Sequence, residues 1–145
     1  MDDLIQELKV TLASNFSFYL KAHNYHWNIE GPNFPQYHSF FESIYTNTWE
    51  AVDTIAEHLR TLDSYAPASL IRFTELSLIY DEVNIPSGLG MISKLLADNM
   101  ILIKQLTKTQ ELAEQNKKMG LSNFLQDRID MHEKFGWQLR SAQKV

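Results

Sequence analysis

Residues 35–64 read PQYHSFFESIYTNTWEAVDTIAEHLRTLDS, and this stretch decides the fold. One set of its side chains recurs at intervals of three, four or seven residues, which is the spacing of one face of an α-helix. The set is Tyr37, Phe41, Ile44, Thr48, Ile55, Leu59 and Leu62. We therefore expect a long helix from about Pro35 to Ser64, with this face turned towards the core.

A second set of side chains lies on a neighbouring arc of the same helix, within about 120° at about 100° per residue. It consists of His38, Glu42, Tyr45, Trp49, Asp53, Glu57 and Arg60. A face exposed only to water would not need Tyr45 and Trp49. We therefore expect this face to meet another protein surface and to hold a polar or charged group there.

Metal binding is the chemistry that this second face suggests, because histidine and carboxylate ligands suit iron, zinc and manganese. His38 and Glu42 are four residues apart on the helix. Asp53 and Glu57 have the same spacing, so each pair can point at one ion. His26 lies at the end of the preceding helix, across a short turn from His38. A carboxylate at this spacing can also be simply solvated, so Glu42 stays open as a ligand.

The separation of the two pairs excludes a complete site within one chain. From His38 to Asp53 is roughly 22 Å along a straight helix, whereas metal–ligand bonds are about 2 Å long. A two-fold dimer with antiparallel second helices brings the His26/His38 end of one chain to the Asp53/Glu57 end of the other. Such an interface is isologous, so it would hold two equivalent sites.

The rest of the chain predicts three further long helices and one short one. We expect them at residues 2–28, 70–76, 87–116 and 120–141. The buried side of the helix at 87–116 should consist mainly of Met91, Leu95, Met100, Leu102, Leu106 and Leu112. Two short connections and one long one, at 68–86, predict an all-α four-helix bundle with one crossover. The length fits a single domain spanning residues 1–145.

Composition narrows the function further. The 145 residues carry a formal net charge of −5, which argues against a protein built mainly to grip nucleic acid. The chain has no cysteine, which excludes disulfides and thiolate metal sites. The start Met1-Asp2-Asp3-Leu4 lacks the features of a signal peptide, and no apolar run approaches about 20 residues. The expectation is a soluble, cytoplasmic protein.

Two parts of the chain resemble the Dps family, the mini-ferritins named for DNA protection in starved cells. The first comprises His26-Trp27-Asn28, Gly31-Pro32-Asn33-Phe34, His38 and Asp53-Thr54-Ile55-Ala56-Glu57, in the order and spacing of the family's ferroxidase motif. The second, Arg128 to Lys134 with Trp137 to Ser141, is similar to the family's last helix. The resemblance covers nearly the whole chain and implies a ferritin-like four-helix bundle with a short helix in the long connection between the second and third long helices.

The resemblance also implies a function. It identifies His26, His38, Asp53 and Glu57 as the catalytic metal ligands of a ferroxidase, with Glu42 as a further acidic ligand and Trp27 beside the site. Members of the family build a hollow dodecamer from two-fold dimers, oxidise Fe(II) with hydrogen peroxide or oxygen, and store ferric mineral inside. Iron is therefore the expected metal, and zinc could occupy the same ligands. Removing Fe(II) and peroxide together would protect against oxidative damage.

Two departures from the family qualify this expectation. Many relatives contact DNA with a Lys-rich N-terminal tail, whereas this sequence begins Met1-Asp2-Asp3, so we expect weak or no direct DNA binding. The family often lines an iron-entry pore with aspartates near the start of the last helix. Here that stretch reads NKKMGLSN at residues 116–123, which leaves Asp127 and Asp130 as the candidates for an acidic pore.

Alternative interpretations remain for single residues and for the whole chain. A lone His26 or His38 is more often a structural histidine than a ligand. We expect His23 to be a structural neighbour of the site, His58 to lie at the surface or in an interface, and His132 to serve in packing or in a helix-end hydrogen bond. The chain could instead be a non-catalytic assembly or chromatin protein that kept the fold and lost the chemistry. An intrachain di-iron oxidase would use Glu-x-x-His motifs, and the sequence contains none.

Overall fold

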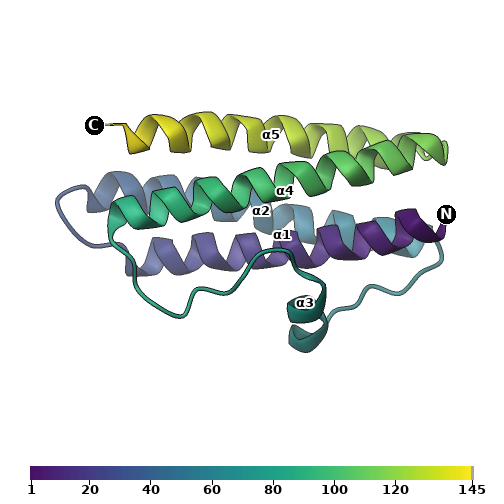
Figure 1. Cartoon of the computed structure of the whole chain (residues 1–145), viewed down its shortest axis with the longest axis horizontal. Helices are drawn as coiled ribbons and strands as arrows, with labels where there is room; N and C mark the ends of the chain where they lie inside the picture. The colour runs from purple at the N-terminus through teal and green to yellow at the C-terminus, as the bar shows by residue number, and fades with distance from the viewer. Residues whose placement is uncertain (145) are drawn as a thin grey trace.

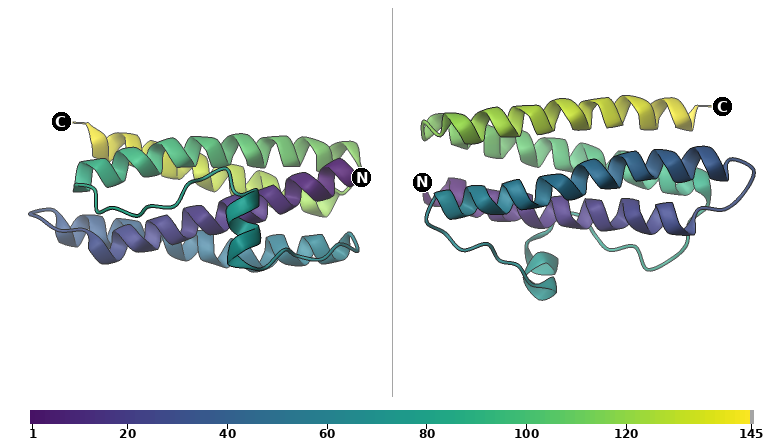
Figure 2. Two further views of the ribbon diagram at one scale, coloured as in Figure 1. Left: turned by 60° about the horizontal axis from the view of Figure 1, so that its bottom comes forward. Right: turned by 180° about the vertical axis from the view of Figure 1, so that it is seen from behind.

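The computed structural model describes residues 1–144, which fold into helices joined by loops. The helices are α1 (Asp2–Asn28), α2 (Phe34–Thr61), α3 (Leu70–Leu76), α4 (Gly88–Gln115) and α5 (Met119–Gln143). The four long helices form a bundle, and α3 stands beside α1 in the crossover between α2 and α4 (Figures 1 and 2). The predicted all-α bundle with a short helix in its long connection is confirmed. Among residues 1–144, no helix is both long and apolar enough to cross a membrane.

The boundaries of α2 differ slightly from the prediction because of local backbone chemistry. Pro35 lies in the first turn, where its missing N–H costs no intrahelical hydrogen bond. At the other end, Asp63 has a φ of 60°, which is left-handed and cannot continue the helix. The helix therefore ends at Thr61, three residues before the predicted Ser64.

The core is built mainly from the apolar stripes of the four long helices. On α2 the side chains of Phe41, Ile44, Ile55 and Leu59 are fully buried, as the spacing predicts. On α4 the expectation for Met100 is wrong, since that side chain is 63% exposed. The neighbouring Asn99 is buried instead, and both its amide nitrogen and its amide oxygen are hydrogen-bonded to His132 of α5.

That buried network joins three helices. Asn99 Nδ2 on α4 donates to the backbone carbonyl of His132 on α5 (2.8 Å), and His132 Nδ1 lies 2.8 Å from Asn99 Oδ1. Because an amide oxygen only accepts, His132 Nδ1 carries the proton and Nε2 is the acceptor. Arg128 Nη2 donates to this Nε2 at 3.2 Å, and Arg128 Nη1 donates to Asn47 Oδ1 on α2 at 2.6 Å.

The network requires a neutral imidazole. Burial lowers the pKa of His132 well below 6.5, and the adjacent Arg128 charge lowers it further. Burial also lowers the pKa of Arg128 to about 10, so the guanidinium stays charged at neutral pH. Protonation of His132 would remove the acceptor of Arg128 and place two positive charges side by side in the core. The sequence prediction of a packing role for His132 is confirmed.

We predict that His132 makes the bundle sensitive to acid. Its folded pKa lies below its unfolded value, so its effect is absent above about pH 6.5 and grows as the pH falls towards the folded pKa. Each pH unit in that window costs about 1.4 kcal/mol of stability. Urea unfolding at fixed protein concentration, at pH 7 and pH 5, should show a smaller loss for His132→Gln than for the wild type. Equal losses would contradict this assignment.

Candidate metal centre

His26 and His38 hold each other at the turn between α1 and α2. His26 Nδ1 lies 2.7 Å from the carbonyl oxygen of His38, and His38 Nδ1 lies 2.7 Å from the carbonyl oxygen of His26. The two rings are stacked with centroids 3.7 Å apart and 16° between their planes. A carbonyl only accepts, so both Nδ1 atoms carry protons and both Nε2 lone pairs are available in the neutral rings. Metal-ligating histidines are commonly fixed in this way.

The local backbone explains why the two histidines meet. The N–H of Ile29 bonds to the carbonyl of Tyr25 and closes α1. Gly31 then turns with a φ of 114°, a region that favours glycine, and its carbonyl accepts the N–H of Phe34. This tight reversal places the end of α1 beside the start of α2. The Phe34 ring stacks on His38 at 4.8 Å, and His26 is buried beneath the pair.

Asp53 and Glu57 form the second pair, one turn apart on the exposed face of α2. The pKa of Glu57 is raised by a hydrogen bond with Asp53 and by the negative charge of that carboxylate. The two groups therefore face one another closely enough to compete for a proton. A cation bound between them would relieve the repulsion, which suits a hard metal ion.

The two pairs do not meet within one chain. Among the described residues 1–144, no three His, Asp or Glu side chains lie close enough to hold a metal ion. The structure brings His26 to His38 and Asp53 to Glu57, while roughly 22 Å of α2 separates His38 from Asp53. Glu42 is exposed one turn after His38.

Aromatic side chains line the face between the two pairs and pack more closely than the sequence predicts. His23 is stacked between Trp27, at 3.7 Å, and Tyr45, at 3.8 Å between ring centroids. Tyr19 Oη lies 2.8 Å from His23 Nδ1. Burial and the neighbouring His26 lower the pKa of His23, which keeps its ring neutral. The four-residue spacing of Tyr19, His23 and Trp27 on α1 is the sequence feature from which this stack could have been predicted.

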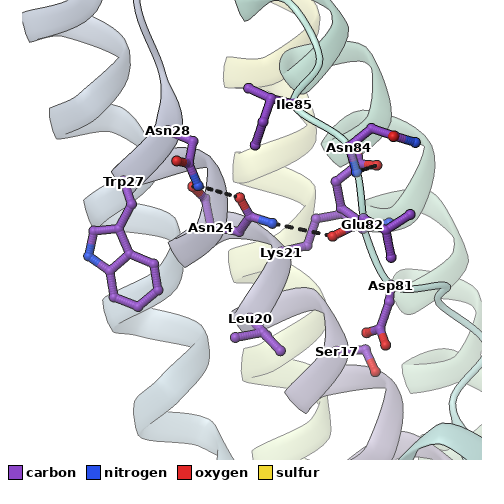
Figure 3. Close-up of a pocket in the computed structure, with 11 residues that line it drawn as sticks. Ser17, Leu20, Lys21, Asn24, Trp27, Asn28, Asp81, Glu82, Asn84 and Ile85 are labelled. Atoms are coloured by element: carbon purple, nitrogen blue, oxygen red, sulfur yellow. Dashed lines mark hydrogen bonds between the residues drawn. The ribbon is translucent and has the colours of Figure 1, made fainter.

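A hollow of about 430 Å³ lies beside Trp27, between α1 and the strap, which we define as residues 77–87 (Figure 3). The strap is anchored by Glu82, whose Oε1 accepts the buried Tyr25 hydroxyl at 2.7 Å and the Lys94 ammonium at 2.9 Å. The Tyr25 and Lys94 hydrogen bonds lower the pKa of Glu82 to about 2. Glu82 is therefore ionised around neutral pH, and its hydrogen bond with Tyr25 holds the strap against α1.

Comparison with known proteins places this arrangement in a family. A family model described as a ferritin-like domain matches residues 5–144. The DNA protection during starvation protein of Brevibacillus brevis is 31% identical over 147 residues, covering 97% of this chain and 98% of that protein.

Solved structures agree with the fold and the family. The crystal structure of antigen TpF1 from Treponema pallidum matches with a TM-score of 0.95 at 30% identity, covering 99% of this chain and 93% of that one. The Dps structure from Vibrio cholerae O1 matches with a TM-score of 0.94 at 30% identity, covering 99% and 90%. Its title calls that protein a member of a broad superfamily of ferritin-like diiron-carboxylate proteins. The chain described here belongs to the ferritin-like proteins and, within them, to the Dps family.

Proposed function

We propose that the protein is a ferroxidase and iron-storage mini-ferritin whose metal sites are shared between two chains. The observation that carries this proposal is the pair of imidazoles, His26 and His38, with both Nε2 lone pairs set free by reciprocal Nδ1 bonds. The carboxylates of Asp53 and Glu57 supply the other half of the ligand set. Iron is the substrate, and this mixture of neutral nitrogen and charged oxygen donors fits it.

A second chain completes the site. With two copies of α2 antiparallel, Asp53 and Glu57 of the partner subunit face His26 and His38, and the symmetry generates a second equivalent site. The exposed aromatics Trp27 and Trp49, at 61% and 52% exposure, lie on the same face. Burying them between chains removes apolar surface from water. Twelve such chains in a hollow shell would provide the space for ferric mineral.

The ligand set also accounts for the direction of the chemistry. Oxidation raises the charge on iron from +2 to +3, and the carboxylates of Asp53 and Glu57 stabilise the more highly charged ion. The neutral imidazoles limit the negative charge of the site, so Fe(II) binding stays reversible. With hydrogen peroxide as oxidant, two Fe(II) ions give up two electrons while peroxide and two protons become two waters. Consuming both reactants would suppress hydroxyl-radical formation.

Anaerobic loading with Fe(II) followed by peroxide or oxygen tests the activity. We expect oxidation well above the uncatalysed rate, and a reduction of at least about tenfold in His38→Ala or Glu57→Ala, since each removes a ligand. The oxidation rate of Glu42→Gln shows whether this fifth candidate ligand contributes to the site. Glu114→Gln, at an exposed position on α4, is the matched control. Oxidation no faster than in buffer would rule out the enzymatic proposal.

Mixing two inactive variants tests whether the site is shared. His26→Ala and Asp53→Ala chains should each lose both sites of their own dimers. After subunit exchange at equal concentrations, a mixed dimer holds one site with all four ligands, so about a quarter of the sites recover. The measurement is the initial rate of Fe(II) oxidation before and after exchange. Absence of recovery once mass spectrometry confirms mixed dimers would refute sharing.

We infer that direct DNA binding is weak. The net charge of −5 opposes association with a polyanion, and non-specific affinity depends on clustered Lys and Arg. A gel-shift titration of the metal-free protein at low salt should show no retarded band at micromolar protein. Tight binding that weakens steeply with added salt would overturn this inference.

A further inference from the structure

The hydrogen bonds of His26 and His38 anchor each ring at a single atom, Nδ1. A full turn of either ring would break its bond, but a rocking motion would not, because hydrogen bonds accept a broad range of angles and the χ2 torsion of histidine has a broad minimum. Metal binding tolerates only about 0.5 Å and 10–20° of misplacement. The direction of each Nε2 lone pair therefore depends on what the ring packs against.

Two aromatic rings enclose His38. Phe34 lies nearly parallel to it, with centroids 4.8 Å apart and 25° between the planes. His26 lies nearly parallel to it as well, at 3.7 Å and 16°. One face of an imidazole has no room for two rings at these distances, so Phe34 and His26 cover opposite faces. His38 is thereby held in the middle of a stack of three rings.

The two imidazoles are not enclosed in the same way. His26 is only 7% exposed, and Tyr45 meets it nearly edge-on at 5.0 Å and 63°. Tyr45 in turn stacks on His23 at 3.8 Å and 7°, so the surroundings of His26 are packed from several sides. His38 is half-buried near the start of α2, and Phe34 is the ring on its outer face. His38 is therefore the ligand whose orientation depends most on one neighbour.

The turn before α2, rather than the core, places Phe34. Its N–H bonds to the carbonyl of Gly31 at 3.0 Å. It opens α2 one turn before His38, so the two side chains lie on one face of the helix. The ring is 40% exposed, whereas Phe41 of the same helix is fully buried. A ring left partly in water adds less to the core than a buried one, and this ring is stacked on the face of His38.

We propose that Phe34 is a positioning residue of the metal centre, whose ring holds the plane of His38 and so aims its Nε2 at the shared ion. This inference deepens the proposed function and rests on it, because the direction of Nε2 matters only if His38 is a ligand. A ligand held in its binding orientation loses little freedom when the metal arrives, which raises the affinity. Loss of the ring should therefore weaken metal binding before it affects the oxidation step.

Anaerobic titration with Co(II) measures the binding, because Co(II) accepts nitrogen and oxygen ligands and its visible absorption reports the geometry around the ion. Phe34→Leu keeps an apolar side chain but removes the flat ring. We expect it to weaken Co(II) binding about tenfold and to change the absorption bands. Phe34→Tyr keeps the ring and should restore both. Wild-type affinity and bands in Phe34→Leu would show that the ring positions nothing.

Phe40→Leu is the matched control. Phe40 is another partly exposed ring of α2, but it lies about 200° around the helix from His38 and packs on Phe41, with centroids 6.1 Å apart. Both leucine variants should lose similar thermal stability, since each removes similar apolar contact, while only Phe34→Leu should lose Co(II) affinity. Equal losses of affinity in the two variants would mean a purely structural role and overturn the proposal.

The kinetics of Fe(II) oxidation distinguish binding from chemistry. Phe34→Leu should raise the Fe(II) concentration that gives the half-maximal rate, again about tenfold, and leave the rate at saturating Fe(II) within about twofold of the wild type. A lower saturating rate with an unchanged half-maximal concentration would contradict positioning and indicate a role in the oxidation step itself.

Crystal structures of the metal-free protein separate this inference from the proposed function. In Phe34→Leu the His38 ring should leave its 16° stack on His26 or occupy more than one orientation, and the wild type should keep the stack. An unmoved ring overturns the positioning role, and Fe(II) oxidation by the wild type then leaves the proposed function intact. A wild type that neither binds Co(II) nor oxidises Fe(II) refutes the proposed function, and the positioning role falls with it.

Discussion

The stiffness of α2 is the constraint on which the rest depends. A helix of 28 residues holds its side chains at fixed separations, and fifteen residues put His38 and Asp53 roughly 22 Å apart. No loop motion within one chain brings these residues to a common ion. The helix thus presents two ligand pairs on one face, and the face between them is occupied by stacked aromatic rings. On the proposed symmetric pairing, two such faces would complete the ligand sets and cover the aromatic rings together.

The two ligand pairs differ in how firmly they are held. His26 and His38 are locked by reciprocal bonds to backbone carbonyls, so neither ring can turn without losing its Nδ1 hydrogen bond. Asp53 and Glu57 are exposed carboxylates that interact chiefly with one another. On the proposed shared site, a rigid nitrogen pair would face an adaptable oxygen pair, which suits a metal whose charge and radius change during the reaction.

Much of the fold was predictable because helical spacing is a local signal. The ranges of α1 and α3 match the prediction, and the core face of α2 follows its apolar stripe. Met100 was misplaced because hydropathy favours a methionine over an asparagine in the core. The actual choice depended on Asn99 meeting His132, a contact between residues 33 positions apart that no spacing rule contains.

For the site as well, the sequence did not predict which side chains and backbone groups contact one another. Spacing alone put His38 near His26 and Asp53 near Glu57, which the structure reproduces within one chain. The exchange of Nδ1 bonds with backbone carbonyls was not foreseeable, because it depends on how tightly the turn at Gly31 reverses the backbone. The stacking of His23 between Trp27 and Tyr45 likewise needed the register between α1 and α2.

Dividing the ligands between the two ends of α2 has a consequence for a newly made chain. On the proposed function, each end of α2 holds half a ligand set, so a lone molecule would have no complete site at which to oxidise iron, however much Fe(II) and peroxide surround it. On the proposed pairing, redox activity switches on only when a second copy has closed over the aromatic face. If the proposed function holds, the chain would be chemically silent until it is assembled, and iron oxidation would start only where the shell that stores its product has formed.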